Sequence, residues 1–226
     1  MSATPFGQDY YARNYRDYEA QNPARKLRYY ARVIERHRDP LAPKRIHDVG
    51  CAFGRFLATL PADWQLCGSD PSEHAIARAA QVVPRAAFRM ASAAQPCPFE
   101  GKFGVVCAFD TLEHVEDLDA AGAAVHDQLV AGGLFVFVVP VYDGLSGPLI
   151  RWLDRDPTHV HKLPRRRWLE WAARGFEVVA WWGVLRYLLP GRHYAHVPTK
   201  LLRHHTPAII TVCRRRLGEP GRRKPD

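Results

Sequence analysis

The stretch Ile46–Leu57 has the sequence IHDVGCAFGRFL. An apolar run opens it, and Gly50 and Gly54 follow. Glycine adopts backbone conformations that other residues avoid, and at Gly54 it lets a first helical turn approach a ligand with no side chain between them. The stretch therefore predicts a buried strand, a tight turn and a helix start, an arrangement that can cradle a cofactor. A purely structural strand-to-helix turn would use glycine in the same way.

Further strands are predicted at regular intervals after this turn. Leu66–Asp70 (LCGSD) ends in an acidic residue, and nucleotide-binding folds place a carboxylate there to accept hydrogen bonds from the ribose hydroxyls. Phe103–Asp110 (FGVVCAFD) predicts a third buried strand, followed by Thr111–Val115 (TLEHV) and a helix that ends near Val130. Ala131–Pro140 (AGGLFVFVVP) predicts a glycine stop and another strand.

In this order the four motifs resemble those of the class I S-adenosylmethionine-dependent methyltransferases. Members of that family have aspartate-valine-glycine-cysteine, then glycine-x-aspartate, then leucine-glutamate-histidine-valine, then paired glycines. The resemblance spans roughly Tyr29–Trp182. It implies an α/β enzyme with a Rossmann-like, seven-stranded, mostly parallel sheet, helices on both faces, and S-adenosyl-L-methionine as cofactor.

The resemblance also implies which residues bind the cofactor. They are Asp48, Gly50, Ala52, Gly54, Asp70, Pro71, Ser92 and Asp110. The chain departs from the family pattern twice. Ala52 stands where a further glycine is usual, and its small side chain should still permit close approach. Between Phe88 and Phe99 the family's adenine-binding aspartate is missing, so backbone groups or the Ser92 hydroxyl would replace it, or binding would be weaker and less selective for the base.

The length of 226 residues suits one α/β domain with a full core and is short for two. Alternating strand and helix signals predict parallel strands with right-handed crossovers in its middle part. A helix is also expected at Arg167–Arg174, with strands at Phe176–Trp182 and Ala208–Cys213. We expect a single domain over 1–213, followed by a basic disordered tail (214–226). The domain would begin with a helical cap (1–43) that contains an amphipathic helix within 9–38. A cofactor-binding core (44–141) and a substrate-side half (142–213) with an insertion (183–206) would follow.

The insertion 183–206 mixes aromatic, aliphatic and basic residues. Such a stretch can lie in a membrane interface with its basic residues at anionic headgroups, which would make a lipid-linked acceptor natural. A helical flap packed on the sheet edge is the favoured interpretation, because an apolar stripe usually belongs to the core.

The net charge of +9 is unevenly distributed: residues 160–226 hold 15 Lys and Arg against 4 Asp and Glu. This excess indicates an anionic substrate or surface, although a solvated basic face would look the same. Nucleic acid is the less favoured partner, because no recognisable RNA-binding module accompanies the basic residues.

A hydroxyl acceptor needs help with deprotonation, and histidine is the residue most often used. His159 and His161 lie in the loop after the last strand of the core, and alternate spacing would point both the same way in an extended segment. Similar family members have aspartate-x-x-histidine here, which makes Asp156 and His159 substrate-side residues. His114 is a third candidate, although Asp110 and Glu113 have the spacing of a capping box, which would make it an ordinary first-turn residue.

The same residues allow a metal alternative. Asp110, Glu113, His114 and either His159 or His161 could form an oxygen and nitrogen shell, in faint resemblance to RNA 3′-terminal 2′-O-methyltransferases. Those enzymes begin the cluster with glutamate, and metal-free ubiquinone-pathway O-methyltransferases share the leucine-glutamate-histidine-valine string. We therefore assign no metal.

The expected reaction is methyl transfer to a hydroxyl of a small-molecule or lipid- or glycan-linked acceptor. An RNA methyltransferase and a non-catalytic cofactor-binding protein are the alternatives. The chain does not start with an apolar signal region, and its longest apolar run is far shorter than the ~20 residues of a membrane span. Its five cysteines show no paired spacing. We therefore expect a cytoplasmic protein with reduced cysteines and at most peripheral membrane contact.

Overall fold

The computed structural model describes residues 18–144, 147–154, 156–189 and 193–216. The first part of the expected cap and the end of the expected tail lie outside this range. The helices are α2 (Tyr18–Gln21), α3 (Ala24–His37), α4 (Glu73–Val82), α5 (Leu118–Gln128), α6 (Gly147–Leu153) and α7 (Arg165–Gly175), with 3-10 turns η1 (Leu57–Thr59) and η2 (Leu112–His114). The strands are β1 (Arg45–Val49), β2 (Gln65–Asp70), β3 (Ala87–Met90), β4 (Phe103–Phe109), β5 (Leu129–Pro140), β6 (Phe176–Leu189), β7 (His193–Thr199) and β8 (Ala208–Arg215).

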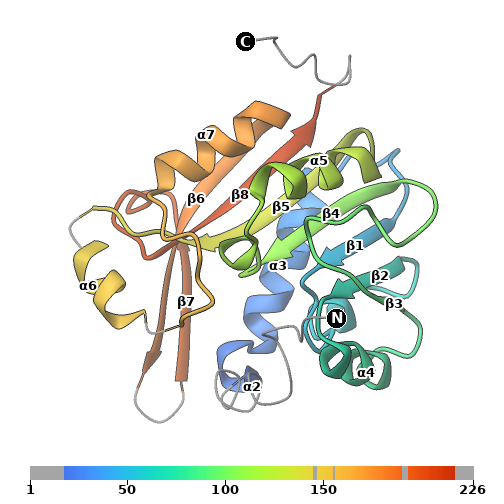
Figure 1. Ribbon diagram of the computed structural model, residues 1–226, viewed down its shortest axis with the longest axis horizontal. Helices are drawn as coiled ribbons and strands as arrows, with labels where there is room; N and C mark the ends of the chain where they lie inside the picture. Colours follow the sequence, from blue (N-terminus) through green and yellow to red (C-terminus); the bar gives the residue numbers. More distant parts are fainter. Residues whose placement is uncertain (1–17, 145–146, 155, 190–192, 217–226) are drawn as a thin grey trace.

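Within the described residues eight strands form one sheet in the order β3-β2-β1-β4-β5-β8-β6-β7 (Figure 1). The strands from β3 to β5 are parallel to their neighbours, whereas β8 is antiparallel to both β5 and β6, and β7 is antiparallel to β6. The Rossmann-like, mostly parallel sheet is confirmed. The predicted count of seven is one too few, because the insertion contributes β7.

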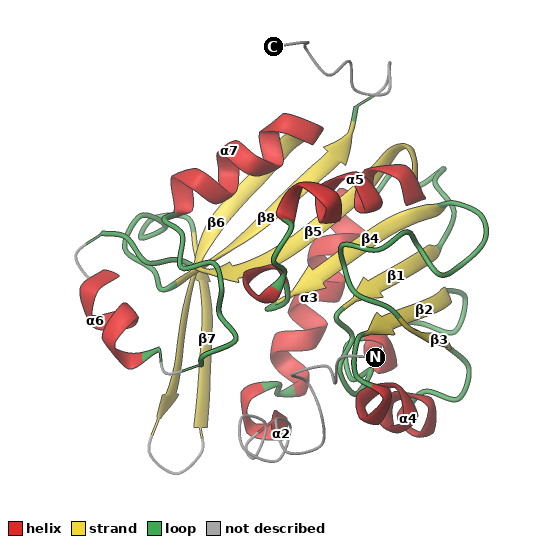
Figure 2. Ribbon diagram, in the orientation of Figure 1, coloured by secondary structure: helices red, strands yellow, loops and turns green. Residues whose placement is uncertain are grey.

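Helices cover both faces of this sheet (Figure 2). Side chains of α3 and α4 pack on one face, against β1, β2 and β5. Side chains of α5 and α7 pack on the other face, around the fully buried Trp168 and Phe135. The strands β4 and β5 are near-continuous apolar runs because both of their faces are covered.

The insertion 183–206 forms a β-hairpin, so the helical flap favoured from the sequence is wrong. The end of β6 pairs with β7 from Gly183↔Thr199 to Leu189↔His193. Trp182 and Val184 pack in the core cluster that includes α3, whereas Trp181 packs against the cluster on the other face of the sheet. The side chains thus alternate between faces with the two-residue period of a strand, which aromatic and β-branched residues favour. The hairpin extends past the rest of the sheet toward α2 (Figure 1).

Several basic residues of the C-terminal third are used inside the fold. Arg165 is 6% exposed and forms a double hydrogen bond with the Asp143 carboxylate. β8 continues to Arg215, into the segment expected to be disordered, and Arg214 and Arg215 donate to the backbone carbonyls of Gly132 and Leu129. Among the described residues, no helix is both long and apolar enough to cross a membrane.

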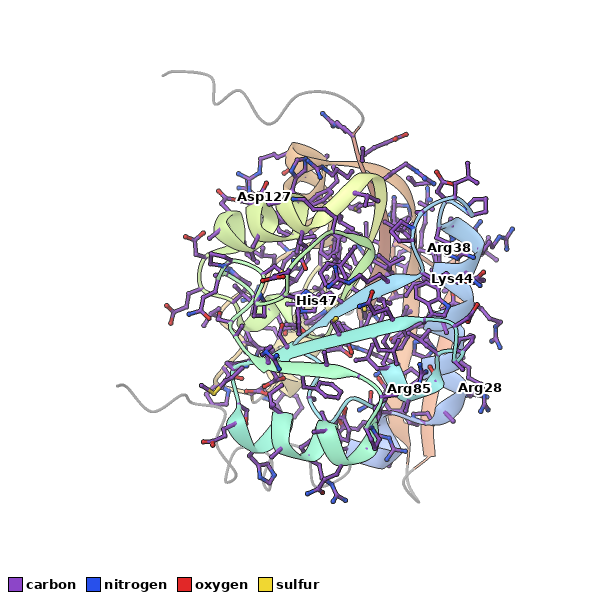
Figure 3. All side chains as sticks on the ribbon, turned by 90° about the vertical axis from the view of Figure 1, so that its right-hand side faces the viewer. Arg28, Arg38, Lys44, His47, Arg85 and Asp127 are labelled. Carbon is purple, nitrogen blue, oxygen red and sulfur yellow. The ribbon has the colours of Figure 1, made fainter. Side chains whose placement is uncertain are left out.

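His47 is a buried polar residue on β1 and lies deep among the side chains, while Arg28 and Arg38 lie at the periphery (Figure 3). Its Nδ1 donates to Gln128 Oε1, and its Nε2 accepts from the Ser69 hydroxyl 2.9 Å away. This pairing ties β1 to β2 and α5 and suits a neutral imidazole.

Burial lowers the pKa of His47 from 6.5 to about 4. Between pH 6.5 and 4, His47 is protonated in the unfolded chain but not in the native chain. The free energy of unfolding should therefore fall as the pH falls through this range. His47 alone should contribute about 3 kcal/mol to this fall. Urea denaturation at a series of pH values measures it. The His47→Gln variant should have a shallower slope, and an equal slope would contradict the assignment.

Candidate functional site

A cavity of about 390 Å³ opens beside the carboxyl ends of β1 and β4. α2 and α3 form one wall, η2 and the loop after α6 form another, and the β6–β7 hairpin contributes Arg186 and Tyr194. Ligands of parallel α/β sheets bind at this edge, where loops follow the strand ends. Of the residues named from the sequence, those that line it are Asp48, Gly50, Ala52, Asp110, Glu113, His114, Asp156 and His159.

The turn after β1 is held in an unusual backbone conformation. Gly50 has a φ of 73°, and an added Cβ would lie only 2.9 Å from Thr111 Cβ. The Gly50 and Cys51 amides donate to Ser69 O at 2.8 and 3.0 Å, which fixes the turn against β2. Ala52 has a φ of 44°, a left-handed conformation that strains any residue with a Cβ.

Asp70 fixes the same turn from the end of β2. Its carboxylate accepts hydrogen bonds from the amides of Ala52 and Ser72, both at 3.0 Å. Asp70 is 5% exposed and does not line the cavity described above. A carboxylate held by two backbone donors keeps one orientation, as hydrogen bonding to a ribose would require.

Three other predicted cofactor residues lie apart from the cavity. Pro71 connects β2 to α4, and Ser92 follows β3, where its hydroxyl accepts from the Ala94 amide at 3.5 Å. Gly54 has a φ of 70°, and an added Cβ would lie 3.1 Å from the Phe88 ring. The structure therefore gives Gly54 a packing reason for glycine.

Asp48 is a buried acid that lines the cavity. Burial raises its pKa to about 7, aided by the negative Asp70, while a hydrogen bond from the Cys107 thiol acts in the opposite direction. A carboxyl with this pKa changes its charge readily when a cation or a hydrogen-bond donor approaches.

Asp110 also has a left-handed backbone, with a φ of 54°. Its carboxylate pairs with Arg186 from the hairpin and, at 3.4 Å, with Lys26 of α3. Burial by itself would raise the pKa of Asp110, but the Arg186 and Lys26 cations outweigh it and hold the pKa well below its usual range. Asp110 is therefore an ionised link between three elements.

The predicted capping box is wrong. Thr111 is the N-cap of η2, and no side chain makes a cap hydrogen bond there. Asp110 points to its cations, whereas Glu113 is 1% exposed and its Oε2 has no hydrogen-bond partner among the described residues. Burial raises the pKa of Glu113 well above its usual value, and the negative Asp110 adds to this effect.

His114 and His159 both line the cavity, and their ring centroids are 4.6 Å apart. The Nδ1 of His159 lies 2.9 Å from Asp154 Oδ2, and the Tyr142 hydroxyl donates to the same oxygen. Burial and the neighbouring His159 lower the pKa of His114 to about 4, so its imidazole is neutral near pH 7. Ligand atoms of Glu113, His114 and His159 all lie within 4.8 Å of one another.

His161 does not join His159, contrary to expectation. Its Nε2 donates to Val115 O at 2.8 Å, its amide donates to Glu113 O, and its ring lies against Trp168. The loop turns at Pro157 and Thr158 and is not an extended strand, so alternate residues do not share a side. His161 therefore anchors the loop.

The sequence did not single out Arg186, Lys26, Tyr194 or Asp154. Arg186 lies in an insertion whose sequence favoured a helical flap. If the insertion had been recognised as a strand, Arg186 would have been assigned to the same side as Val184, two residues before it. Lys26 lies on the amphipathic helix and is only 4% exposed. A lysine on such a helix is normally expected to face solvent, so the sequence offered no reason to select it.

The backbone conformation of the turn after β1 predicts opposite effects on stability for substitutions at Gly50 and Ala52. Gly50→Ala should lower the free energy of unfolding by at least about 2 kcal/mol, because it adds left-handed strain and a clash with Thr111. Ala52→Gly should raise it by up to about 1 kcal/mol, because strain relief exceeds the entropy cost of glycine. Urea denaturation measures both. A Gly50→Ala chain as stable as the parent would refute this account of the turn.

A family model described as a methyltransferase domain matches residues 16–180. The comparison with curated proteins gives no match. A chain of the complex between the Haloferax volcanii Trm112 methyltransferase activator and a putative methyltransferase is 14% identical, with a TM-score of 0.69, and the match covers 92% of this chain and 97% of that chain.

Two further solved structures have the same fold. A putative methyltransferase from Bacillus halodurans is 12% identical with a TM-score of 0.66, covering 84% of this chain and 99% of that chain. A geranyl diphosphate methyltransferase, solved with GPP and sinefungin, is 15% identical with a TM-score of 0.61, covering 83% of this chain and 78% of that chain. At these identities the likeness to solved structures concerns the fold alone.

Proposed function

The chain belongs to the class I S-adenosylmethionine-dependent methyltransferases, and we propose that it methylates a hydroxyl of a small-molecule or lipid- or glycan-linked acceptor. The observation that carries the proposal is the pair His114 and His159, which lies in the same cavity as the glycine turn after β1. A binding turn and paired imidazoles that line the same cavity suit a transfer between two ligands.

The residues around the turn fit the family's cofactor. The position of Gly50 leaves no room for a Cβ, Asp48 and Ala52 line the cavity, and the Asp70 carboxylate is fixed by backbone donors. We assign Asp48, Gly50, Ala52 and Asp70 to binding the cofactor. S-adenosylmethionine, when bound, supplies an electrophilic methyl group on a positive sulfonium.

The acceptor end is built from oriented imidazoles. With Nδ1–H donated to the ionised Asp154, the His159 ring carries its lone pair on Nε2. The Thr158 hydroxyl donates to Asp156 at 2.6 Å, so His114 Nδ1–H donates to Thr158 and its lone pair is also on Nε2. These lone pairs suit the hydrogen of an acceptor hydroxyl, and removing that hydrogen raises the nucleophilicity of the oxygen.

The charges of Asp154 and its partners support this orientation. Burial would raise the pKa of Asp154, but hydrogen bonds from Tyr142, His159 and Lys162 hold it well below its usual range. The carboxylate therefore stays ionised at neutral pH and keeps His159 in one tautomer. Asp154 and Tyr142 are positioning residues, because they act on the acceptor through His159.

The dimensions of the cavity favour a small acceptor or the end of a larger one. The hairpin and α3 enclose it on the sides of Arg186 and Lys26, which also gives it a basic wall. Nucleic acid is less well supported, since basic residues such as Arg165 and Arg214 are engaged inside the fold. A non-catalytic role does not explain why His159 is so firmly oriented.

The cofactor assignment predicts the outcome of a binding experiment. The purified chain should bind S-adenosylhomocysteine in calorimetry, and Asp70→Ala should weaken binding at least about tenfold, because it removes a charged hydrogen-bond acceptor. Asp127→Ala, at an exposed position, is the matched control and should bind as the parent does. Thermal unfolding confirms that each variant is folded. Equal affinity for all three proteins would remove Asp70 from the site.

The acceptor assignment predicts a graded loss of turnover. His159→Ala should lower kcat by at least about 100-fold, because the hydroxyl loses the group that takes its hydrogen. Asp154→Asn should lower kcat less, and affinity for S-adenosylhomocysteine should not change in either variant. Labelled methyl transfer to a panel of hydroxyl compounds measures kcat.

The control for this series is Val160→Ala, an exposed neighbour of His159 outside the cavity. It should keep the parental kcat. Unchanged turnover in His159→Ala would exclude this residue from the reaction and, with it, the proposed place of the acceptor.

A further inference from the structure

Glu113, His114 and His159 bring a carboxylate and two imidazoles to one point in the cavity wall. One ligand atom from each lies within 4.8 Å of the other two. Glu113 and His114 come from η2, whereas His159 comes from the loop after α6, so the point exists only in the folded chain. Asp110 and His161 are outside this group, because Asp110 binds Arg186 and His161 binds Val115 O.

The Nδ1 atom of each imidazole already has a partner in the protein. His159 Nδ1 lies 2.9 Å from the Asp154 carboxylate, which also receives the Tyr142 hydroxyl and, at 3.0 Å, the Lys162 ammonium. His114 Nδ1 lies 2.9 Å from Thr158 Oγ1. Proteins orient metal-binding imidazoles in this way, with the outer nitrogen donating to a carboxylate or another oxygen and the inner nitrogen presenting its lone pair.

Glu113 is the member of the group that the fold does not satisfy. The residue is 1% exposed, and its Oε2 has no hydrogen-bond partner among the described residues. A buried carboxyl oxygen without a partner costs free energy and calls for an explanation in a native structure. It lines the same cavity as the two imidazoles.

An acceptor hydroxyl does not satisfy all three groups, because it has one hydrogen to donate and meets two lone pairs and a carboxyl oxygen. A divalent cation satisfies them together. Imidazole nitrogen with carboxylate oxygen suits first-row ions such as Zn²⁺, Mn²⁺, Fe²⁺ and Co²⁺ better than Ca²⁺ or Mg²⁺, which prefer all-oxygen shells.

We propose that Glu113, His114 and His159 bind one divalent first-row transition-metal ion in the cavity, with Asp154 and Thr158 orienting the two histidines. Three protein ligands leave coordination positions open, as in metal sites that bind a substrate. An oxygen of the acceptor takes one of these positions.

The catalytic consequence rests on the proposed function, whereas binding of the ion does not. The coordinated hydroxyl loses its proton to solvent because the ion lowers its pKa. The oxygen then uses its electron pair to bond the methyl carbon as the carbon–sulfur bond breaks. In the loaded enzyme His159 thus serves as a ligand and the ion takes over acidification of the hydroxyl.

Cobalt is the probe that tests the site, because its visible absorption reports the ligand geometry. Co²⁺ is added to the full chain after treatment with a chelator and removal of any affinity tag, and binding is followed by absorption and calorimetry. We expect one equivalent per chain. Glu113→Gln and His159→Ala should weaken binding by more than about 100-fold, and Asp154→Asn by about 10- to 100-fold, because it only orients a ligand.

His205→Ala is the control, since this exposed histidine lies outside the cavity and should leave Co²⁺ affinity unchanged. Circular dichroism checks that the variants fold, and Asp154→Asn tests the site without altering a ligand. The absence of a one-equivalent site, or equal affinity in the parent and in Glu113→Gln and Asp154→Asn, would overturn the proposal.

Methyl-transfer assays separate this proposal from the proposed function. Suppose that the chelator-treated protein binds no Co²⁺ and still transfers methyl groups at the full rate. This result would overturn the metal site and leave the proposed transfer to a hydroxyl intact. A Co²⁺ site that is lost in Glu113→Gln, in a chain that transfers no methyl group to any hydroxyl, would support the metal site and contradict the proposed acceptor.

Discussion

Thr111 packs against Gly50 in the space that a Cβ would otherwise occupy, and its hydroxyl donates to Val49 O at 3.2 Å. This close approach joins the end of β1 to the segment that follows β4. The turn that we assign to the cofactor and the residues that we assign to the acceptor therefore meet at this contact. A larger residue at position 50 would separate them, and the two halves of the cavity would no longer face each other.

A second constraint closes the cavity from the opposite side. Asp110 binds Lys26 of α3 and Arg186 of the hairpin, so three elements distant in the sequence meet at one carboxylate. Removing the Asp110 carboxylate would leave the Lys26 and Arg186 cations close together without a counter-charge, which costs free energy. The hairpin is thereby held over the cavity by charge as well as by pairing between β6 and β7.

Local patterns allowed most of the core to be predicted. The strands around Val49, Asp70 and Val136 were found because apolar runs and glycine stops act over a few residues. The capping box at Asp110 and Glu113 was wrong, since Arg186 and Lys26 offered Asp110 a stronger partner than a backbone amide. The helical flap was wrong because a mixture of aromatic and aliphatic residues suits a helix or a strand, and only pairing with a neighbour decides between them.

The sequence by itself determined the family, the parallel core and the turn at Gly50, because these depend on backbone conformation and burial of short segments. Only the tertiary structure decided which histidine faces the cavity. His159 and His161 are chemically alike and two positions apart, yet one is oriented by Asp154 and the other donates to Val115 O. The carboxylates and carbonyls that made this choice come from separate loops, and no local pattern encodes their meeting.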